Sequence, residues 1–327
     1  GEDVMNVLLK QAESYAYTEY KGKIQNWGYI ANLSLNRFYY SQRDNHSERY
    51  GFQPSLLVSY NPVDNLHFRY HINLKNNAPS IAYLNDVEQR IDILQTRRGN
   101  PDLKSFRSTI QDFNAIFSTG IFSIDALVSY AYEKNPIMES VIYEEGMFIH
   151  TYENQKSFQH LAAEVTFKIK PWKDHISLSV TPGINRYIST GNNYLHTYTL
   201  KELRINLDAS YKNWLLSFMT ITPPNRYVYS EQLLKGDLMH TLMIGYKQPA
   251  WSIMAGIHNP FMKTYRSENA NWSALNPVKS DIHSTNMSNT IVVKLNFNLN
   301  FGRQYKGANK GIQNIDTDSG ILQGTKE

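Results

Sequence analysis

The chain of 327 residues contains no cysteine and no long apolar run. Without cysteine it can have no disulfide framework, no thiolate nucleophile and no cysteine-based metal site. No stretch approaches the ~20 apolar residues that a transmembrane helix needs, and the mean hydropathy is −0.48. These absences exclude a membrane protein built of helices. They do not exclude a membrane protein built of strands. The residues of such strands face lipid and lumen alternately, so a hydropathy plot does not detect them.

The motifs of common enzymes are also absent. The sequence holds no G-x-S-x-G, H-E-x-x-H, P-loop or G-x-G-x-x-G pattern. His67 and His71 are four residues apart, but on a strand this spacing separates them by ~13 Å, too far to share a metal ion. The basic residues are scattered, with a net charge of +4, so they form no nucleic-acid surface. The sequence therefore predicts no enzyme, no cofactor, no metal site and no nucleic-acid partner.

The strongest positive feature is an alternation of apolar and polar residues with a period of two. In residues 291–301 every odd position is apolar, whereas the even positions from 294 to 300 are polar. Most of the alternating segments run longer than the five or six residues of a typical soluble strand, and they reach the ~9–11 residues that cross a membrane. About thirteen such segments are predicted: 10–20, 27–41, 50–60, 65–76, 105–118, 121–134, 156–170, 175–189, 196–211, 214–228, 237–247, 250–262 and 286–301.

The connections between these segments alternate between short and long. Short connections occupy 21–26, 61–65, 118–120, 171–174, 212–213 and 247–250, and long ones occupy 77–104, 135–155, 190–195, 229–236 and 263–285. Outer-membrane barrels have short periplasmic turns and long external loops. The order therefore assigns the two ends of the wall, and a hairpin is predicted within the external loop 135–155.

Aromatic residues make up 13% of the chain, with 23 tyrosines. They gather at the short-turn ends of the segments, where amphipathic rings would lie at a lipid–water boundary. The alternative is that aromatic residues simply cap β-hairpins by cross-strand packing. The predicted membrane-interface residues are Tyr20, Trp27, Tyr60, Trp172, Tyr211, Trp214, Tyr246 and Trp251.

Two short motifs and the chain ending suggest a family. The sequence R-R-G-N-P-D-L-K at 97–104 resembles a G-N-P-x-L element that heads a strand after a long external loop. T-Y-E-N at 151–154 leads into the predicted strand at 157–170, and the third element is the chain ending, 297–303 followed by D-T-D-S-G at 316–320. In order and placement the chain resembles the C-terminal barrel region of TonB-dependent receptors of Bacteroidota type.

This resemblance implies an all-β, antiparallel transmembrane β-barrel in the bacterial outer membrane. About thirteen strands would be present as part of a 22-stranded barrel, so about nine strands and an N-terminal plug would lie outside this chain. Residues 1–303 would form the barrel portion and 304–327 a polar periplasmic tail. The implied partners are outer-membrane lipid, the plug, the TonB complex that powers import, and a surface lipoprotein over the mouth.

Two groups of polar residues are candidate sites. Arg97, Arg98, Asn100 and Asp102 could bind ligand at the external mouth, although Gly99, Asn100 and Pro101 also read as turn formers. Charged residues on the polar side of the strands could line a solute path, or could form a solvated wall of self-compensating charges. These lumen-lining candidates are Arg69, Glu164, Lys168, Arg204 and Asp208.

The leading functional hypothesis is an outer-membrane receptor and transporter that takes up a scarce solute by a TonB-dependent route. One alternative is a non-transport outer-membrane barrel that serves as a scaffold or adhesin, and another is a soluble all-β binding module. The sequence leaves open the substrate, the oligomeric state and the presence of a lipoprotein partner.

Overall fold

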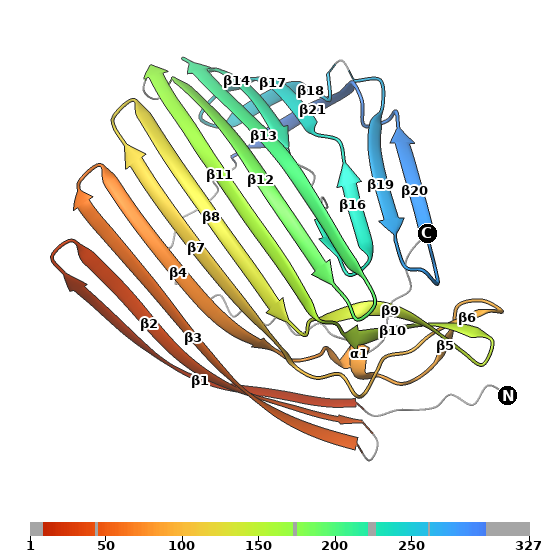
Figure 1. Cartoon of the computed structure of the whole chain (residues 1–327). Helices are drawn as coiled ribbons and strands as arrows, with labels where there is room; N and C mark the ends of the chain where they lie inside the picture. Colours follow the sequence, from red (N-terminus) through yellow and green to blue (C-terminus); the bar gives the residue numbers. More distant parts are fainter. Residues whose placement is uncertain (1–8, 43–44, 173–174, 222–226, 261, 299–327) are drawn as a thin grey trace.

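The computed structural model describes residues 9–42, 45–172, 175–221, 227–260 and 262–298. Its main element is a 13-stranded sheet in which the strands follow one another in chain order (Figure 1). Every neighbouring pair is antiparallel. The predicted all-β class and strand number are confirmed. The strands are β1 (Leu9–Ile24), β2 (Trp27–Gln42), β3 (Asn45–Val63), β4 (Leu66–Asn77), β7 (Phe106–Ser118), β8 (Phe122–Lys134), β11 (Ser157–Trp172), β12 (Ile176–Thr190), β13 (Leu195–Tyr211), β14 (Trp214–Ile221), β17 (Met239–Lys247), β18 (Trp251–His258) and β21 (Thr290–Phe297).

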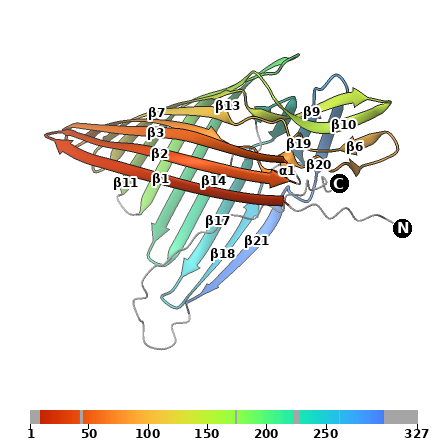
Figure 2. The same cartoon turned by 90° about the horizontal axis from the view of Figure 1, so that it is seen from below.

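The sheet curves into a wall, as Figures 1 and 2 show from two directions. Within the described part of the chain, β1 pairs only with β2 and β21 pairs only with β18. The wall is therefore an open arc in which both edge strands keep one unpaired side. A closed barrel is not observed.

The strand register separates an apolar face from a polar face. On β8, Val128 lies opposite Phe113 of β7 and Ala163 of β11. The preceding residue, Leu127, lies opposite Asn114 and Glu164 on the other side of the sheet. We call the side that carries Val128 the apolar face and the side that carries Leu127 the polar face. Because side chains alternate along a strand, this register assigns the faces of the wall, with one change of phase between Tyr60 and Val63 of β3 and one between Ile169 and Trp172 of β11.

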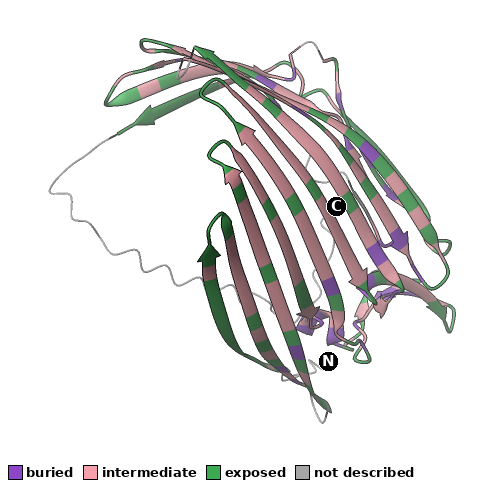
Figure 3. Ribbon diagram, turned by 60° about the vertical axis from the view of Figure 1, so that its left-hand side comes forward, coloured by how far each residue is buried: buried purple, intermediate pink, exposed green. Residues whose placement is uncertain are grey.

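Most of the wall is half-buried or exposed, and buried positions are few (Figure 3). Among the described residues no second layer packs against this single layer of strands, so its apolar face is uncovered by them. Exposed apolar side chains recur on that face from Leu35 on β2 to Leu295 on β21. No helix among the described residues is long and apolar enough to cross a membrane.

Two smaller sheets stand at the long-loop end of the wall. The first external sheet has the order β5-β6-β10-β9, with β6 and β10 parallel. The second external sheet has the order β15-β16-β19-β20. Their strands are β5 (Gln89–Arg90), β6 (Gln95–Arg97), β9 (Ile137–Glu144), β10 (Met147–Asn154), β15 (Tyr227–Tyr229), β16 (Gln232–Gly236), β19 (Tyr265–Asn271) and β20 (Val278–Ser284).

The hairpin predicted within 135–155 is confirmed as β9 and β10. The long connections predicted at 229–236 and 263–285 contain strands that were not predicted, β16, β19 and β20. The single strand predicted at 214–228 was also wrong. β14 ends at Ile221, and Tyr227–Tyr229 pairs instead with β16. The tail predicted at 304–327 lies outside the described residues.

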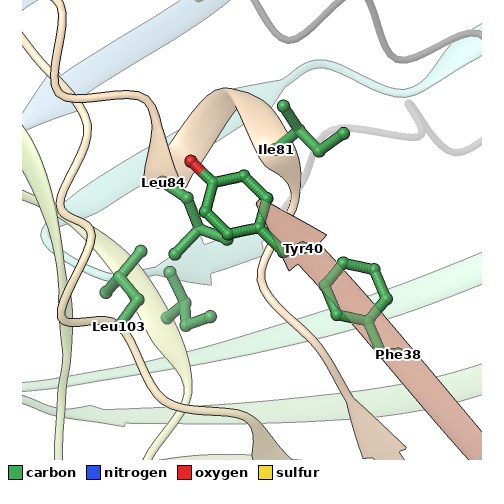
Figure 4. Packing of buried hydrophobic residues seen from close by; sticks show 6 residues of the cluster. Phe38, Tyr40, Ile81, Leu84 and Leu103 are labelled. Carbon is green, nitrogen blue, oxygen red and sulfur yellow. The ribbon is translucent and has the colours of Figure 1, made fainter. Parts of the chain in front are cut away.

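A buried cluster anchors the loop between β4 and β7 to the wall. The one-turn helix α1 (Ile81–Leu84) is capped by Ser80, whose hydroxyl accepts a hydrogen bond from the Ala82 N–H. Ile81 and Leu84 pack against Phe38 and Tyr40 of β2 (Figure 4). The remaining buried members are Leu103 and Ile137. Burial of these side chains from four segments fixes the external loops over the end of the wall.

Candidate functional site

The two sequence motifs, 97–104 and 151–154, lie against each other in the external loops. The Asn154 side chain accepts a hydrogen bond from the Lys104 N–H at 2.8 Å and donates to the Lys104 and Asn135 carbonyls, each at 2.9 Å. The Asn100 side chain donates to the Tyr152 carbonyl at 3.0 Å and accepts from the Asp102 N–H at 2.9 Å. These bonds join a turn to a hairpin some 50 residues along the chain.

The surroundings of Gly99 explain why the motif at 97–104 has a glycine at this position. Its N–H donates to the Asn85 carbonyl at 2.7 Å. A Cβ atom at this position would lie 2.4 Å from the Tyr83 carbonyl oxygen and 2.5 Å from that of Asn85. The turn can therefore approach the end of α1 this closely only without a side chain.

The structure separates the four predicted ligand residues. Arg98 forms an ion pair with Glu144 at 2.7 Å, and its N–H donates to the His150 carbonyl. Asn100 holds the turn as described above, and Asp102 is exposed within that turn. Arg97 lines a cavity. The ligand-binding role of all four residues stays a prediction.

The cavity that Arg97 lines has a volume of about 250 Å³ and lies between the two external sheets. One wall comes from β6, β9 and β10, and the other from β16, β19 and their turns. It is lined by Arg97, Glu139, Ser140, Val141, His150, Thr151, Tyr152, Ser230, Glu231, Gln232, Asn271 and Ser273. Apart from Arg97, sequence reasoning missed these residues, since they come from segments predicted as separate loops.

Hydrogen bonds between loops hold the two cavity walls together. The Ser230 hydroxyl donates to the Glu139 carbonyl at 2.9 Å, and the Gln232 amide donates to the Glu139 carboxylate. The Ser189 hydroxyl, at the end of β12, donates to the Ser230 carbonyl at 2.7 Å. Because these bonds connect residues 41 to 93 positions apart, the cavity depends on several loops folding together.

The charges around the cavity are mixed. Burial and the neighbouring Arg97 guanidinium lower the pKa of His150, which favours its neutral form, and its Nε2 lies 2.9 Å from Gln95 Oε1. Burial raises the pKa of the Tyr152 hydroxyl and keeps it neutral. The remaining ionisable groups are one guanidinium and the carboxyl groups of Glu139 and Glu231. Such a lining can bind a polar solute through hydroxyl, amide and carboxylate groups.

The five predicted lumen-lining residues all lie on the polar face. Arg204 forms a hydrogen-bonded ion pair with Glu164 across the intervening strand β12. The Ser217 hydroxyl donates to Asp208 at 2.9 Å. Register places Arg69 opposite Asn114 and Lys168 opposite Ser179. At least the Glu164–Arg204 charges compensate each other, and a role in a solute path stays a prediction.

The eight predicted interface aromatics lie at the short-turn ends of the wall, on its apolar face. Neighbouring rings form a series of contacts between strands. Ring centroids are 4.3 Å apart for Trp27 and Tyr60, 5.2 Å for Trp214 and Tyr246, and 5.9 Å for Tyr246 and Trp251. Tyr20 contacts Tyr29, and Trp172 contacts Tyr211. Both cross-strand packing and an interfacial position are compatible with this arrangement.

Solved structures with the same fold include transporters and receptors. The FrpB iron transporter from Neisseria meningitidis (F3-3 variant) matches with a TM-score of 0.59 and 11% identity, over 85% of this chain and 45% of that one. The siderophore receptor PirA from Pseudomonas aeruginosa matches with a TM-score of 0.55 and 13% identity, over 90% of this chain and 57% of that one. The copper transporter OprC matches with a TM-score of 0.59 and 13% identity, over 89% and 48%. At these identities the likeness shows the fold alone.

The chain spans about half the length of the structures it matches. None of the curated proteins matches it in sequence. The model of the outer membrane protein beta-barrel family, however, matches residues 6–263, most of the chain. This match and the shared fold place the protein in the bacterial outer membrane, and the chain belongs to the outer membrane protein β-barrel family.

Proposed function

We propose that this chain forms part of the wall of a ligand-gated transporter that takes up a scarce solute by a TonB-dependent route. The complete barrel would have 22 strands, and an N-terminal plug would close its lumen and contact the TonB complex. The similarity of the wall to an iron transporter, a siderophore receptor and a copper transporter supports this proposal. So does the partial coverage of those chains, which leaves room for more strands and a plug.

The observation that carries the proposal is the polar cavity between the two external sheets. A receptor must first capture its solute outside the membrane, and external loops commonly carry that function. Here the external loops fold into two sheets that lie over the end of the wall and line a polar cavity. Arg97 would contact the solute, while Arg98, Asn100 and Asp102 would hold the turn that positions it.

The polar face of the wall would carry the solute onward. Arg69 and Lys168 supply positive charge there, and Asp208 and the Glu164–Arg204 pair supply further polar groups. A lumen lined by hydrogen-bonding groups holds water. A polar solute that passes through it can replace its hydrogen bonds to water with hydrogen bonds to the protein.

The proposal is tested by uptake in cells that carry the complete gene. Deletion should abolish accumulation of one solute among iron chelates, cobalamin, copper, glycans and peptides. An uncoupler should block accumulation but leave binding intact. Arg97→Ala should weaken binding of that solute, whereas Arg90→Ala, on β5 outside the cavity lining, should not. Normal accumulation of every solute in the deletion strain would contradict transport.

A non-transport scaffold is the second candidate, and the edge of the second external sheet favours it. Within the described residues β20 pairs only with β19, and its Val278 and Ile282 side chains are 52% and 58% exposed. An exposed edge strand with apolar side chains can accept a strand from a partner such as a surface lipoprotein. A photo-crosslinking amino acid at position 282 should capture that partner in cells. If no crosslinked partner formed there, the scaffold function would be refuted.

A further inference from the structure

The apolar face of the wall contains a groove near its short-turn end. Its volume is about 280 Å³, and its lining includes Trp172, Ile176, Ala209, Tyr211, Trp214 and Ile244. This groove is unrelated to the cavity in the external loops. It lies on the surface that faces lipid in an outer-membrane protein.

The groove exists because one small residue lies between larger ones. Ala209 of β13 lies opposite Ile176 of β12 on one side and Leu216 of β14 on the other. Leu216 in turn lies opposite Ile244 of β17. A methyl group in a row of branched side chains lowers the surface at its own position. Ala209 therefore forms the floor of the groove.

Aromatic rings form the end of the groove toward the short turns. The Trp172 ring centroid is 6.1 Å from that of Tyr211 and 4.7 Å from that of His175. His175 is itself held, because its Nδ1 lies 3.0 Å from the Ser210 carbonyl and its N–H donates to the Trp172 carbonyl. On the other side the Trp214 ring meets Tyr246 edge-on at 5.2 Å. The groove is therefore preformed, so an occupant need not order it.

The positively charged side chain of Lys212 lies at the aromatic end of the groove. Lys212 occupies the turn between Tyr211 and Trp214, and its Nζ lies 5.4 Å from the centroid of the Tyr211 ring. The side chain of Lys212 is exposed. An apolar channel that ends at aromatic rings and an ammonium group matches the two parts of a phospholipid, an acyl chain and a phosphate.

We propose that this groove binds one phospholipid, with an acyl chain lying over Ala209 between the Trp172 and Trp214 rings and the phosphate at Lys212. The short-turn end of an outer-membrane barrel faces the periplasm, so the lipid belongs to the periplasmic leaflet. Because the site depends on fixed rings and a specific depression, its lipid exchanges more slowly than the lipids that only surround the wall. The proposal requires the outer-membrane location but not transport.

Native mass spectrometry of the complete protein, released from detergent micelles that contain phosphatidylglycerol, tests the site. The wild-type protein should retain one phospholipid per chain after the detergent is removed. Ala209→Leu fills the floor with an equally lipid-compatible side chain and should lower the retained fraction at least about tenfold, since each lost methylene contact weakens binding. Ala126→Leu, on the apolar face of β8 opposite Ala115 and Val165, is the matched control and should retain lipid as the wild type does.

The headgroup contact has its own variant. Lys212 has a φ of 51°, and asparagine tolerates this left-handed conformation. Lys212→Asn should therefore fold and should lose preference for phosphatidylglycerol over a neutral diacylglycerol. Heat-modifiable migration on a gel would confirm that each variant is folded. The site is refuted if the wild type retains no phospholipid, if Ala209→Leu and Ala126→Leu retain equal amounts, or if Lys212→Asn keeps the headgroup preference.

Discussion

Two adjacent apolar residues on β8 should respond very differently to the same substitution. Val128 lies on the apolar face and is 45% exposed, whereas Leu127 lies on the polar face opposite Asn114 and Glu164. Hydropathy alone would treat the two residues alike. Register assigns one to lipid and the other to the lumen. Arginine at each position therefore tests the assignment of faces without relying on residue type.

The position of Val128 along the strand sets the expected magnitude. It lies six residues after Phe122, where β8 leaves its short turn. At ~3.3 Å per residue and a tilt of ~40°, this places Val128 about 15 Å above the periplasmic boundary, close to the midplane of a ~25 Å apolar band. Arginine on the lipid face at the midplane costs ~2–4 kcal/mol. We therefore expect Val128→Arg to lower the free energy of unfolding by ~2–4 kcal/mol.

Leu127→Arg should cost well under half as much, because its guanidinium enters a polar face and lies beside the Glu164 carboxylate. The measurement is guanidinium chloride unfolding of the complete protein in phospholipid vesicles, followed by tryptophan fluorescence. Val128→Leu serves as the control for changes in side-chain volume. Equal costs for the two arginine variants, or a larger cost for Leu127→Arg, would refute the assigned faces.

Three further predictions concern the external loops and the polar face. Gly99→Ala should open the turn at 97–104, because its Cβ would lie 2.4 Å from the Tyr83 carbonyl oxygen; limited proteolysis of intact cells should then cut this loop, and unchanged cleavage would contradict the close approach. Because burial lowers the pKa of His150 in the folded protein, the unfolded hairpin binds a proton more readily, so the free energy of unfolding of β9–β10 is highest above pH ~6.5 and decreases as the pH falls from there through the folded pKa. Hydrogen exchange of β10 amides should show this dependence in the wild type but not in His150→Gln. Arg204→Met should change the free energy of unfolding by less than ~1 kcal/mol, because the Arg204 and Glu164 side chains are 37% and 33% exposed and solvent screens the pair; a loss above ~2 kcal/mol in the same unfolding assay would show that the pair is desolvated.

The wall could be predicted from sequence because its periodicity is long and local. Each strand repeats the apolar–polar alternation over many residues, and antiparallel neighbours follow one another in the chain. The prediction at 214–228 went wrong where this regularity stops. β14 ends at Ile221, and the apolar and aromatic residues at 227–229 form the separate strand β15. β15 pairs with β16 in the second external sheet and lies against β12 and β13.

The external sheets could not be predicted by the same reasoning. β5 and β6 have two and three residues, too few to show a period. β6 pairs in parallel with β10 across some 50 residues, and no hairpin turn marks such a pairing. The second external sheet joins strands from two different long loops. Its formation depends on the wall, which brings these loops to the same end.

The residues of the candidate site also fall into two groups, those that a local sequence motif marks and those that only distant contacts bring together. The R-R-G-N-P-D motif attracted attention because glycine, asparagine and proline form a recognisable turn, and the structure uses Arg98, Gly99 and Asn100 to fasten that turn to α1 and the β9–β10 hairpin. The other lining residues, such as Gln232 and Glu139, carry no motif, because they contact each other across 93 positions of the chain. Substitutions at these positions can alter the chemistry of the cavity while the turn keeps its shape. In the proposed transporter we therefore expect solute specificity to depend on residues that sequence motifs do not mark.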